Sequence, residues 1–496
     1  MRRIQPIVFC ASLSITGLTA WSVAAQEAGS TEQQQAEENS SVEAKESPAP
    51  SVPGPKLLNL RYDEDFTYLD GEPGSYREDA FDPIKNIRLG EGWRLDLGGE
   101  FRVRLEAETN KTFGATEPAQ DTFTIFRTLL HADLKHRDGF RVFMQGITAF
   151  DEDRDLALRG IDENRWDVQQ LFFDVRVLGG DPPLTLRVGR QELQYGHQRF
   201  VSPLDWAMVR RRFDAVKLFA KGKTWDLDLW YAKPVDIGQV QRKQRDRYNE
   251  DFDFYGLYVT YKGIPRHGVD GYFFAQDNTG NPINPNGRRG DVSRYTLGSR
   301  FWGKTAGFDY EAELAGQWGR WAGDTIQAWS WSLDGGYTFA ELPWKPRLGA
   351  GFDWASGDDD PRDGKVGTFN QLFPFSHYYF GFLDLVGRQN IEAVNVNLSA
   401  WPVPGTVKAR VAYHAFRLNQ DNDALYNAPG RPIRRDPTGR SGKDVGQELD
   451  VTLTWKLDVH QSVLLGYSHF WDGGLIQRTG ASENADLFFV QYGLKF

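Results

Sequence analysis

Basic side chains recur at every second position in several segments of this 496-residue chain. Arg102 and Arg104 are two residues apart, and so are Lys408 and Arg410. Residues separated by two point to the same face of an extended strand, so each pair would present its charges together. A guanidinium group binds a carboxylate through two parallel hydrogen bonds, and a row of weak sites of this kind would hold an anion without trapping it.

Other constellations that carry chemistry are missing from the sequence. The eight His residues are scattered, with no pair at the spacing of metal ligands. Ser468 and His469 are adjacent, but no nucleophile–base–acid arrangement can be argued from them. The run Asp358–Asp363 is similar to a cation-binding loop, yet it lacks a Glu at the calcium-loop spacing, so we interpret it as a solvated loop tip. We therefore expect no catalytic residues, no bound metal, no cofactor and no enzymatic activity.

Long strands would position the basic pairs. From Trp93 to Ala107, apolar residues alternate with charged residues and Gly98. A soluble sheet seldom needs a strand this long, whereas a tilted transmembrane strand needs about 9–11 residues to cross the hydrocarbon. The alternation recurs along the chain, and the last segment has one apolar face formed by Phe488, Val490, Tyr492, Leu494 and Phe496.

The number and spacing of these segments predict an all-β transmembrane antiparallel barrel. We count about eighteen of them, an even number, as bacterial barrels have. Connections after odd-numbered strands are long, roughly 9 to 36 residues, and those after even-numbered strands are short, roughly 3 to 6 residues, as expected for extracellular loops and periplasmic turns. No later run of about 18 apolar residues follows the N-terminus, so a closed barrel is the structure that could span a membrane.

The N-terminus indicates secretion. Arg2 and Arg3 precede an apolar stretch with a small-residue cleavage site, which predicts a signal peptide at 1–25, although an N-terminal anchor is the alternative. Residues 26–56 are acidic and Pro-rich and are predicted to be disordered. Residues 57–90 form an acidic–aromatic periplasmic lead-in without a clear period, and 91–496 form the barrel. Aromatic residues make up 14% of the chain, which suits a protein that faces lipid, and a net charge of −10 argues weakly against nucleic acid.

With the apolar face toward lipid, the charged face must line the lumen. Basic and acidic groups are nearly balanced there, and many could pair across the wall. The long connections 191–211 and 417–446 carry Arg clusters that would fold inward and set a constriction. The predicted pore-lining residues from this pattern are Arg102, Arg104, Arg127, Arg187, Arg347, Lys408, Arg410, Glu448 and Asp450.

Two stretches resemble the alginate export family of outer-membrane barrels. The first runs from Leu186 through the Gly189-Arg190-Gln191 motif to Trp206, and continues at Phe213–Val216. The second runs from Asp444–Asp450 to Leu465–Phe470. The resemblance covers about residues 85–496. It implies a monomeric eighteen-stranded barrel whose Arg-rich lumen passes an anionic uronate polysaccharide.

Individual residues follow from these motifs by resemblance. Arg187 and Arg190 would line the pore near the outer constriction. Arg199, Asp205, Glu448 and Asp450 would lie near them.

The resulting hypothesis is a channel in the cell outer membrane that passively exports an anionic polysaccharide or oligosaccharide such as alginate. A general or substrate-specific porin for uptake of small organic anions is the first alternative, and a surface scaffold without transport is the second. The expected partners are the anionic solute and outer-membrane lipid, without nucleic acid, and the protein is expected to be a monomer. The identity of the solute, the direction of flow and the gating loop stay open at this point.

Overall fold

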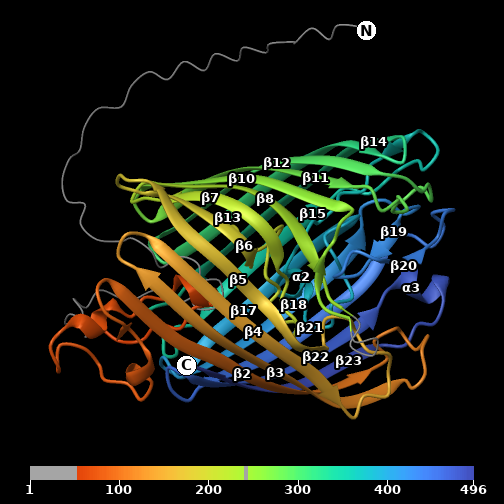
Figure 1. Cartoon of the computed structure of the whole chain (residues 1–496). Helices are drawn as coiled ribbons and strands as arrows, with labels where there is room; N and C mark the ends of the chain where they lie inside the picture. Colours follow the sequence, from red (N-terminus) through yellow and green to blue (C-terminus); the bar gives the residue numbers. More distant parts are fainter. Residues whose placement is uncertain (1–52, 239–243) are drawn as a thin grey trace, which may run out of the picture.

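Antiparallel strands close into a single barrel in the computed structural model, which describes residues 53–238 and 244–496 (Figure 1). The sheet contains 21 strands, of which β1, β9 and β16 are two residues long, and the other eighteen form the wall. The last strand pairs with the first, from Glu100 opposite Lys495 to Thr109 opposite Asp486. This closed barrel confirms the predicted fold class. The predicted signal peptide and the predicted disordered segment up to residue 52 lie outside the described residues.

Each wall strand pairs with its neighbours in chain order. The wall strands are β2 (Trp93–Thr109), β3 (Gln120–His136), β4 (Phe140–Glu152), β5 (Asn164–Leu178), β6 (Leu184–Gln191), β7 (Phe213–Lys221), β8 (Trp225–Asp236), β10 (Phe252–Ile264), β11 (His267–Asn278), β12 (Val292–Thr305), β13 (Phe308–Trp321), β14 (Asp324–Thr338), β15 (Arg347–Ala355), β17 (Ile391–Val403), β18 (Val407–Leu418), β21 (Asp444–Lys456), β22 (Gln461–Asp472) and β23 (Ala485–Lys495).

Shorter elements lie at the two ends of the barrel and inside it. They are the 3-10 helices η1 (Arg61–Asp63), η2 (Thr67–Asp70) and η3 (Asp82–Ile84), the strands β1 (Ile87–Arg88), β9 (Arg247–Tyr248), β16 (Lys365–Val366), β19 (Ala424–Tyr426) and β20 (Pro432–Arg435), and the helices α2 (Ser376–Phe380) and α3 (Gly474–Thr479). None of the helices in the described ranges is long and apolar enough to cross a membrane.

The alternation in the sequence becomes an inside and an outside. In β2, Glu100, Arg102 and Arg104 are buried toward the lumen, whereas Phe101 and Leu105 between them are 37% and 39% exposed on the outer surface. An apolar outer face and a charged inner face are what a barrel in lipid requires, since only the inner face can meet water or other polar groups.

The connections sort by length, with one exception. The first wall strand begins, and the last wall strand ends, at the end of the barrel that has the short turns. This is the periplasmic end. At the other end, residues 319–327 were predicted to be a long loop, but β13 and β14 continue to a tight turn at Ala322 and Gly323. Both turn residues have positive φ, 52° and 90°. That conformation suits a two-residue hairpin, whose twist matches that of the strands.

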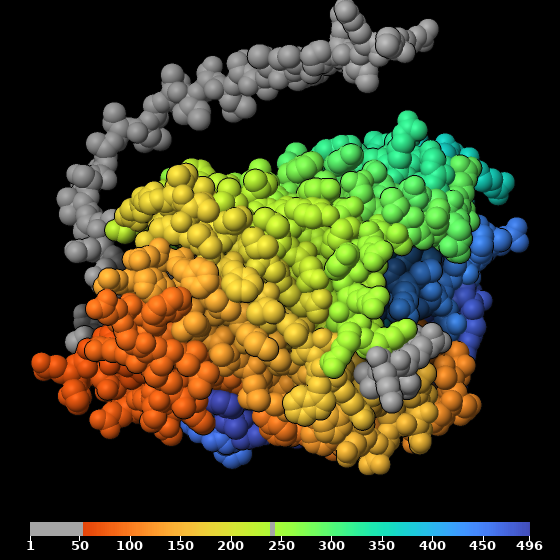
Figure 2. Space-filling model, viewed as in Figure 1, coloured from red at the N-terminus to blue at the C-terminus, as the bar shows by residue number. Residues whose placement is uncertain are grey.

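Three segments enter the barrel. The first inner loop, residues 192–212, follows the short strand β6, and the second inner loop, residues 356–390, contains α2 and β16. The lumen segment, residues 57–66, carries buried Leu60, Tyr62 and Phe66. Figure 1 shows α2 within the outline of the barrel, and Figure 2 shows the surface hollowed at the end away from the N-terminal segment. The core of this protein is therefore the packed lumen.

Candidate functional site in the barrel lumen

Wall arginines hold the first inner loop through Asp205. Arg102 donates from Nη2 to the Asp205 carboxylate at 2.9 Å and from Nη1 to its backbone oxygen at 2.6 Å. Arg127 donates to the same carboxylate at 2.9 Å, and Arg210 of the loop itself also binds it. Glu100 bonds Arg127 and lies 3.1 Å from Arg102. Charge-assisted hydrogen bonds of this kind are roughly twice as strong as neutral ones, so Asp205 fixes the loop against β2 and β3.

Arg104 extends this contact to the next residue of the loop. Its guanidinium lies 3.8 Å from the centroid of the Trp206 ring and donates to the Trp206 backbone oxygen at 2.9 Å. Glu106 balances the charge at 2.6 Å. Arg102, Arg104 and Arg127 were predicted to line the pore. All three contact the first inner loop.

Glu448 and Asp450 hold the second inner loop by its backbone. Leu383 donates its N–H to Glu448 at 3.0 Å, and Phe382 donates to Asp450 at 3.4 Å. Gly381 has φ of 91°, and a Cβ there would clash with the Glu448 carboxylate. Only glycine permits this approach of the loop to the wall.

The two inner loops form one body. Ser202 donates its N–H to the Phe373 backbone oxygen at 2.9 Å, and Phe373 donates to Phe200 at 2.9 Å. The rings of Trp206 and His377 stack with centroids 4.0 Å apart. The sequence predicted that the connections 191–211 and 417–446 set the constriction, whereas the structure joins the first inner loop to residues 356–390, about 170 positions later in the chain.

Arg199 fixes this body to the opposite wall. It binds Glu311 of β13 and Asp334 of β14, and its guanidinium lies 4.1 Å from the ring centroid of Tyr379 in α2. His197 lies 3.1 Å from the same Glu311. Arg199 is 2% exposed, so it acts as an anchor and is not open to solute in this state.

The lumen segment packs against β2 to β6 in the periplasmic half. Arg61 donates to the backbone oxygens of Gly99 and Phe496, both at 2.7 Å. The ring of Tyr62 lies edge-on to Phe172, with centroids 5.4 Å apart. Its hydroxyl donates to the Glu192 backbone oxygen at 3.0 Å, which joins the segment to the first inner loop.

Arg187 contacts this segment and lies in the first half of β6. Its guanidinium pairs with Asp174 at 2.7 and 2.8 Å and lies 4.3 Å from the Tyr62 ring centroid. We expected Arg187 near the outer constriction, but β6 rises from a periplasmic turn and Arg187 is reached early in it. The sequence did not predict this contact, because Tyr62 lies in the acidic lead-in, where no periodic pattern indicates which residues face the barrel.

The structure corrects the prediction for Arg190. It pairs in register with Leu171, which is 37% exposed on the outer surface, and binds Asp214 at 2.7 Å. Arg187 and Arg190 are three residues apart, and residues with an odd separation in a strand point to opposite faces. Arg190 therefore faces outward and is not a pore residue.

Four basic side chains lie on the wall strands from β15 to β21. We call them the cationic strip, and they are Arg347, Lys408, Arg410 and Lys456. The lumen segment packs on other wall strands, β2 to β6. Arg347 binds Asp309 at 2.5 and 2.8 Å. Lys408 and Lys456 each place Nζ 5.8 Å from the Trp401 ring centroid. Arg410 is partly exposed, is bound to no acid in the described part of the chain, and lies close enough to Tyr378 of α2 to interact with it electrostatically. These side chains lie near the periplasmic ends of β15, β18 and β21.

The Asp358–Asp363 run is not a simple loop tip. Asp358 is 2% exposed and accepts a hydrogen bond from Gly367 N at 2.7 Å, and its own N–H donates to Asp423 at 3.0 Å. No group of His, Cys, Asp or Glu among residues 53–238 and 244–496 is arranged to hold a metal ion.

Comparisons with known proteins agree with this architecture. No curated protein matches the chain by sequence. The solved structures that match include Acinetobacter baumannii OccAB2, at 11% identity and a TM-score of 0.54, which covers 81% of this chain and 98% of its own. Pseudomonas aeruginosa OccD3 (OpdP) is similar at 10% identity and a TM-score of 0.53, with 81% and 91% covered. These identities show the fold alone. The family model described as alginate export matches residues 93–490. The chain thus belongs to the alginate export family and is an outer-membrane channel.

Proposed function

We propose that this channel passively exports an anionic polysaccharide or oligosaccharide such as alginate. The family supports a channel for polyanions, and the observation that carries the proposal is the cationic strip. Asp309 and Asp334, the acids beside it, are already bound by Arg347 and Arg199. Arg410 has no acidic partner among the described residues and only Tyr378 as an electrostatic neighbour, so its charge is available to a passing carboxylate. A site that binds weakly and is repeated along a wall lets a charged polymer advance without being retained.

The packing of the lumen favours a second candidate, uptake of small organic anions. Two inner loops and the lumen segment occupy the barrel together in this state. A polymer would need one of them to move, whereas a small anion would need less space.

Planar-bilayer recordings distinguish the two candidates. Short mannuronate oligomers should block the current of the wild-type channel, and neutral dextrins of matched length should block it less. Arg410→Gln should weaken the mannuronate block several-fold, because it removes the unpaired charge. The matched control is Arg417→Gln, which changes an exposed arginine near the other end of the same strand.

Each outcome has a consequence for the proposal. Equal block by mannuronate and dextrin, or an Arg410→Gln channel that is blocked like the wild type, would refute polyanion selectivity. Block by acetate-sized anions alone would favour small-solute uptake. A folded protein without conductance would favour the scaffold.

A further inference from the structure

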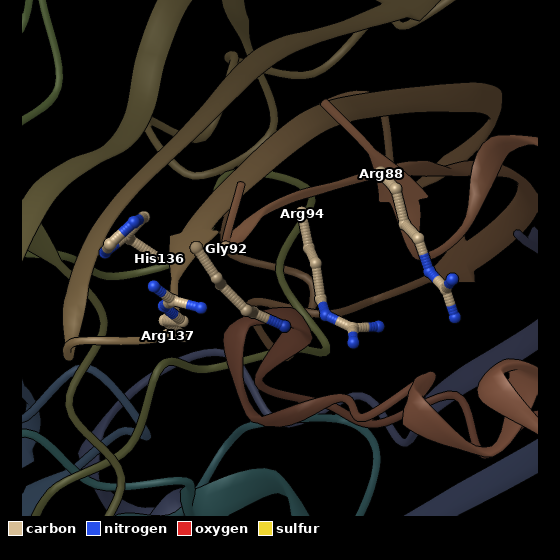
Figure 3. A pocket seen from close by; sticks show the side chains of 6 residues that line it. Arg88, Gly92, Arg94, His136 and Arg137 are labelled. Carbon is tan, nitrogen blue, oxygen red and sulfur yellow. The ribbon is translucent and has the colours of Figure 1, made fainter. Parts of the chain in front are cut away.

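A basic pocket opens at the periplasmic mouth of the barrel. It has a volume of about 490 Å³ and is lined by Arg88, Gly92, Arg94, Lys135, His136 and Arg137. Arg88 belongs to β1, Gly92 precedes β2 and Arg94 lies at its start, Lys135 and His136 end β3, and Arg137 lies in the β3–β4 turn. Figure 3 shows the guanidinium groups of Arg88 and Arg94 extending to the same side. We call it the rim pocket. Of the described residues that line it, none is acidic.

One carboxylate of the chain already uses part of this site. Asp70 lies 2.7 Å from Arg88 Nη2 and 2.7 Å from Arg94 Nη1, so two guanidinium groups share one acid. Lys135 of the pocket is paired with Asp96 at 3.1 Å and with Asp133 at 3.0 Å, so the charges open to another anion are those of the arginines. Arg137 is largely exposed, and the acid nearest to it, Asp138, is 4.0 Å away and exposed too. Solvent screens that pair, so Arg137 is open to another anion.

The position of Asp70 in the chain links the rim pocket to the lumen. Asp70 ends η2, which follows the lumen segment after residue 66. Asn86, next to β1, also donates to Asp70, at 3.0 Å. The ion cluster therefore fastens the chain just outside the barrel, and the buried Arg61 and Tyr62 fasten it just inside.

We propose that the rim pocket is the first binding site for the carboxylates of a uronate polymer on the periplasmic side, and that Asp70 occupies its arginine pair until the polymer arrives. The inference rests on the proposed function and deepens it. A uronate carboxylate has the same shape and charge as that of Asp70, so it binds the same forked donors. A polymer brings a carboxylate on every sugar, and so competes with one Asp70 at high local concentration. Loss of the Asp70 contact removes the outer fastening of the lumen segment, which is the segment that narrows the periplasmic half.

The test uses variants with opposite expected signs. Binding of a fluorescent mannuronate hexamer to the full-length, detergent-solubilised protein is measured by anisotropy, at one low salt concentration. The double variant Arg88→Gln/Arg94→Gln should weaken binding about tenfold or more. Asp70→Asn should strengthen binding several-fold, because it frees the arginine pair. Arg417→Gln at the opposite end is the matched charge control and should bind like the wild type.

The outcomes separate this inference from the proposed function. Block of the current by mannuronate that depends on Arg410, with hexamer binding unchanged in both the Asp70 and the double-arginine variants, would overturn the rim pocket and leave polyanion conduction standing. Absence of hexamer binding and of block in the wild type would refute the proposed function itself. Loss of binding in the arginine variant together with unchanged binding in Asp70→Asn would overturn the competition.

Discussion

Asp205→Asn is the sharpest test of how the constriction is held. The carboxylate of Asp205 binds three arginines, two from the wall and one from its own loop. Asparagine has nearly the same shape and leaves the backbone contact of Arg102 in place. The substitution therefore removes one negative charge and leaves the three guanidinium groups with Glu100 and Glu192 alone.

The size of the effect follows from burial. Removing one partner of a buried ion pair costs about 3–5 kcal/mol. Asp205 has a side chain that is 26% exposed, so water replaces part of the lost interaction, and about 2–3 kcal/mol is a reasonable expectation for its arginine contacts. Since about 1.4 kcal/mol is a factor of ten in an equilibrium, release of the first inner loop should become roughly 30- to 140-fold more frequent.

Single-channel recording measures this directly. Asp205→Asn should show more frequent openings of larger conductance, and its reversal potential in a salt gradient should shift toward anion selectivity, because uncompensated arginines then face the lumen. Asp214→Asn is the control, since Asp214 binds Arg190 on the outer face and has similar exposure. Heat-modifiable migration in gels shows that each barrel is folded. If Asp205→Asn has the conductance distribution and reversal potential of the control, the clamp does not hold the loop.

Three further predictions concern the other contacts. Deleting residues 57–66, with the barrel strands intact, should raise the single-channel conductance, because this segment fills part of the periplasmic lumen; an unchanged conductance would show that the open pathway avoids it. Gly381→Ala should lower the melting temperature, since both the positive φ and the clash with Glu448 oppose a Cβ, and an unchanged melting curve would contradict that approach. The hydrogen bonds from its two arginines hold the pKa of Asp70 well below the ordinary value. A lowered carboxyl pKa stabilises the folded contact above about pH 4 and loses that contribution as pH falls through the lowered value. Protease cleavage of the lead-in should thus be constant from pH 8 to 5, and acceleration within that range would refute the ion cluster.

The fold was predictable because its signal is local. Alternation in β2 assigns Arg102 to the lumen and Phe101 to lipid without knowledge of any other strand. The same rule, applied strictly, would have assigned Arg190 to the outside, since it lies three residues after Arg187. The resemblance to a family motif favoured Arg187 and Arg190 together as pore residues. The odd separation of the two residues along the strand was the better guide. The hairpin at Ala322 and Gly323 was missed because the alternation of apolar and polar residues weakens near Trp321, whereas β13 and β14 continue to pair up to the turn.

The contents of the lumen were not predictable in the same way. Arg61 binds the backbone of Phe496, at the other end of the chain, and no periodicity in the lead-in points to that contact. The two inner loops exchange hydrogen bonds across a large separation in sequence. The Arg content of the first inner loop predicted its inward folding, but the second inner loop, which has few Arg residues, was not predicted to enter the barrel. The partners of both loops could not be derived, because loops have no repeating geometry.

A lumen with balanced charge can still favour anions if its charges have different duties. Asp205, Glu448 and Asp450 bind arginines or backbone N–H groups of the inner loops, so they hold structure and are shielded from solute. The charges of Arg102, Arg104 and Arg127 are likewise used in contacts that hold the first inner loop. Selectivity then depends on the few charges left over, and Arg410 is one of them. Counting inward residues by sign therefore misjudges a barrel whose loops fold inward, and the field along the pathway must be derived from the charges that the loops leave unpaired.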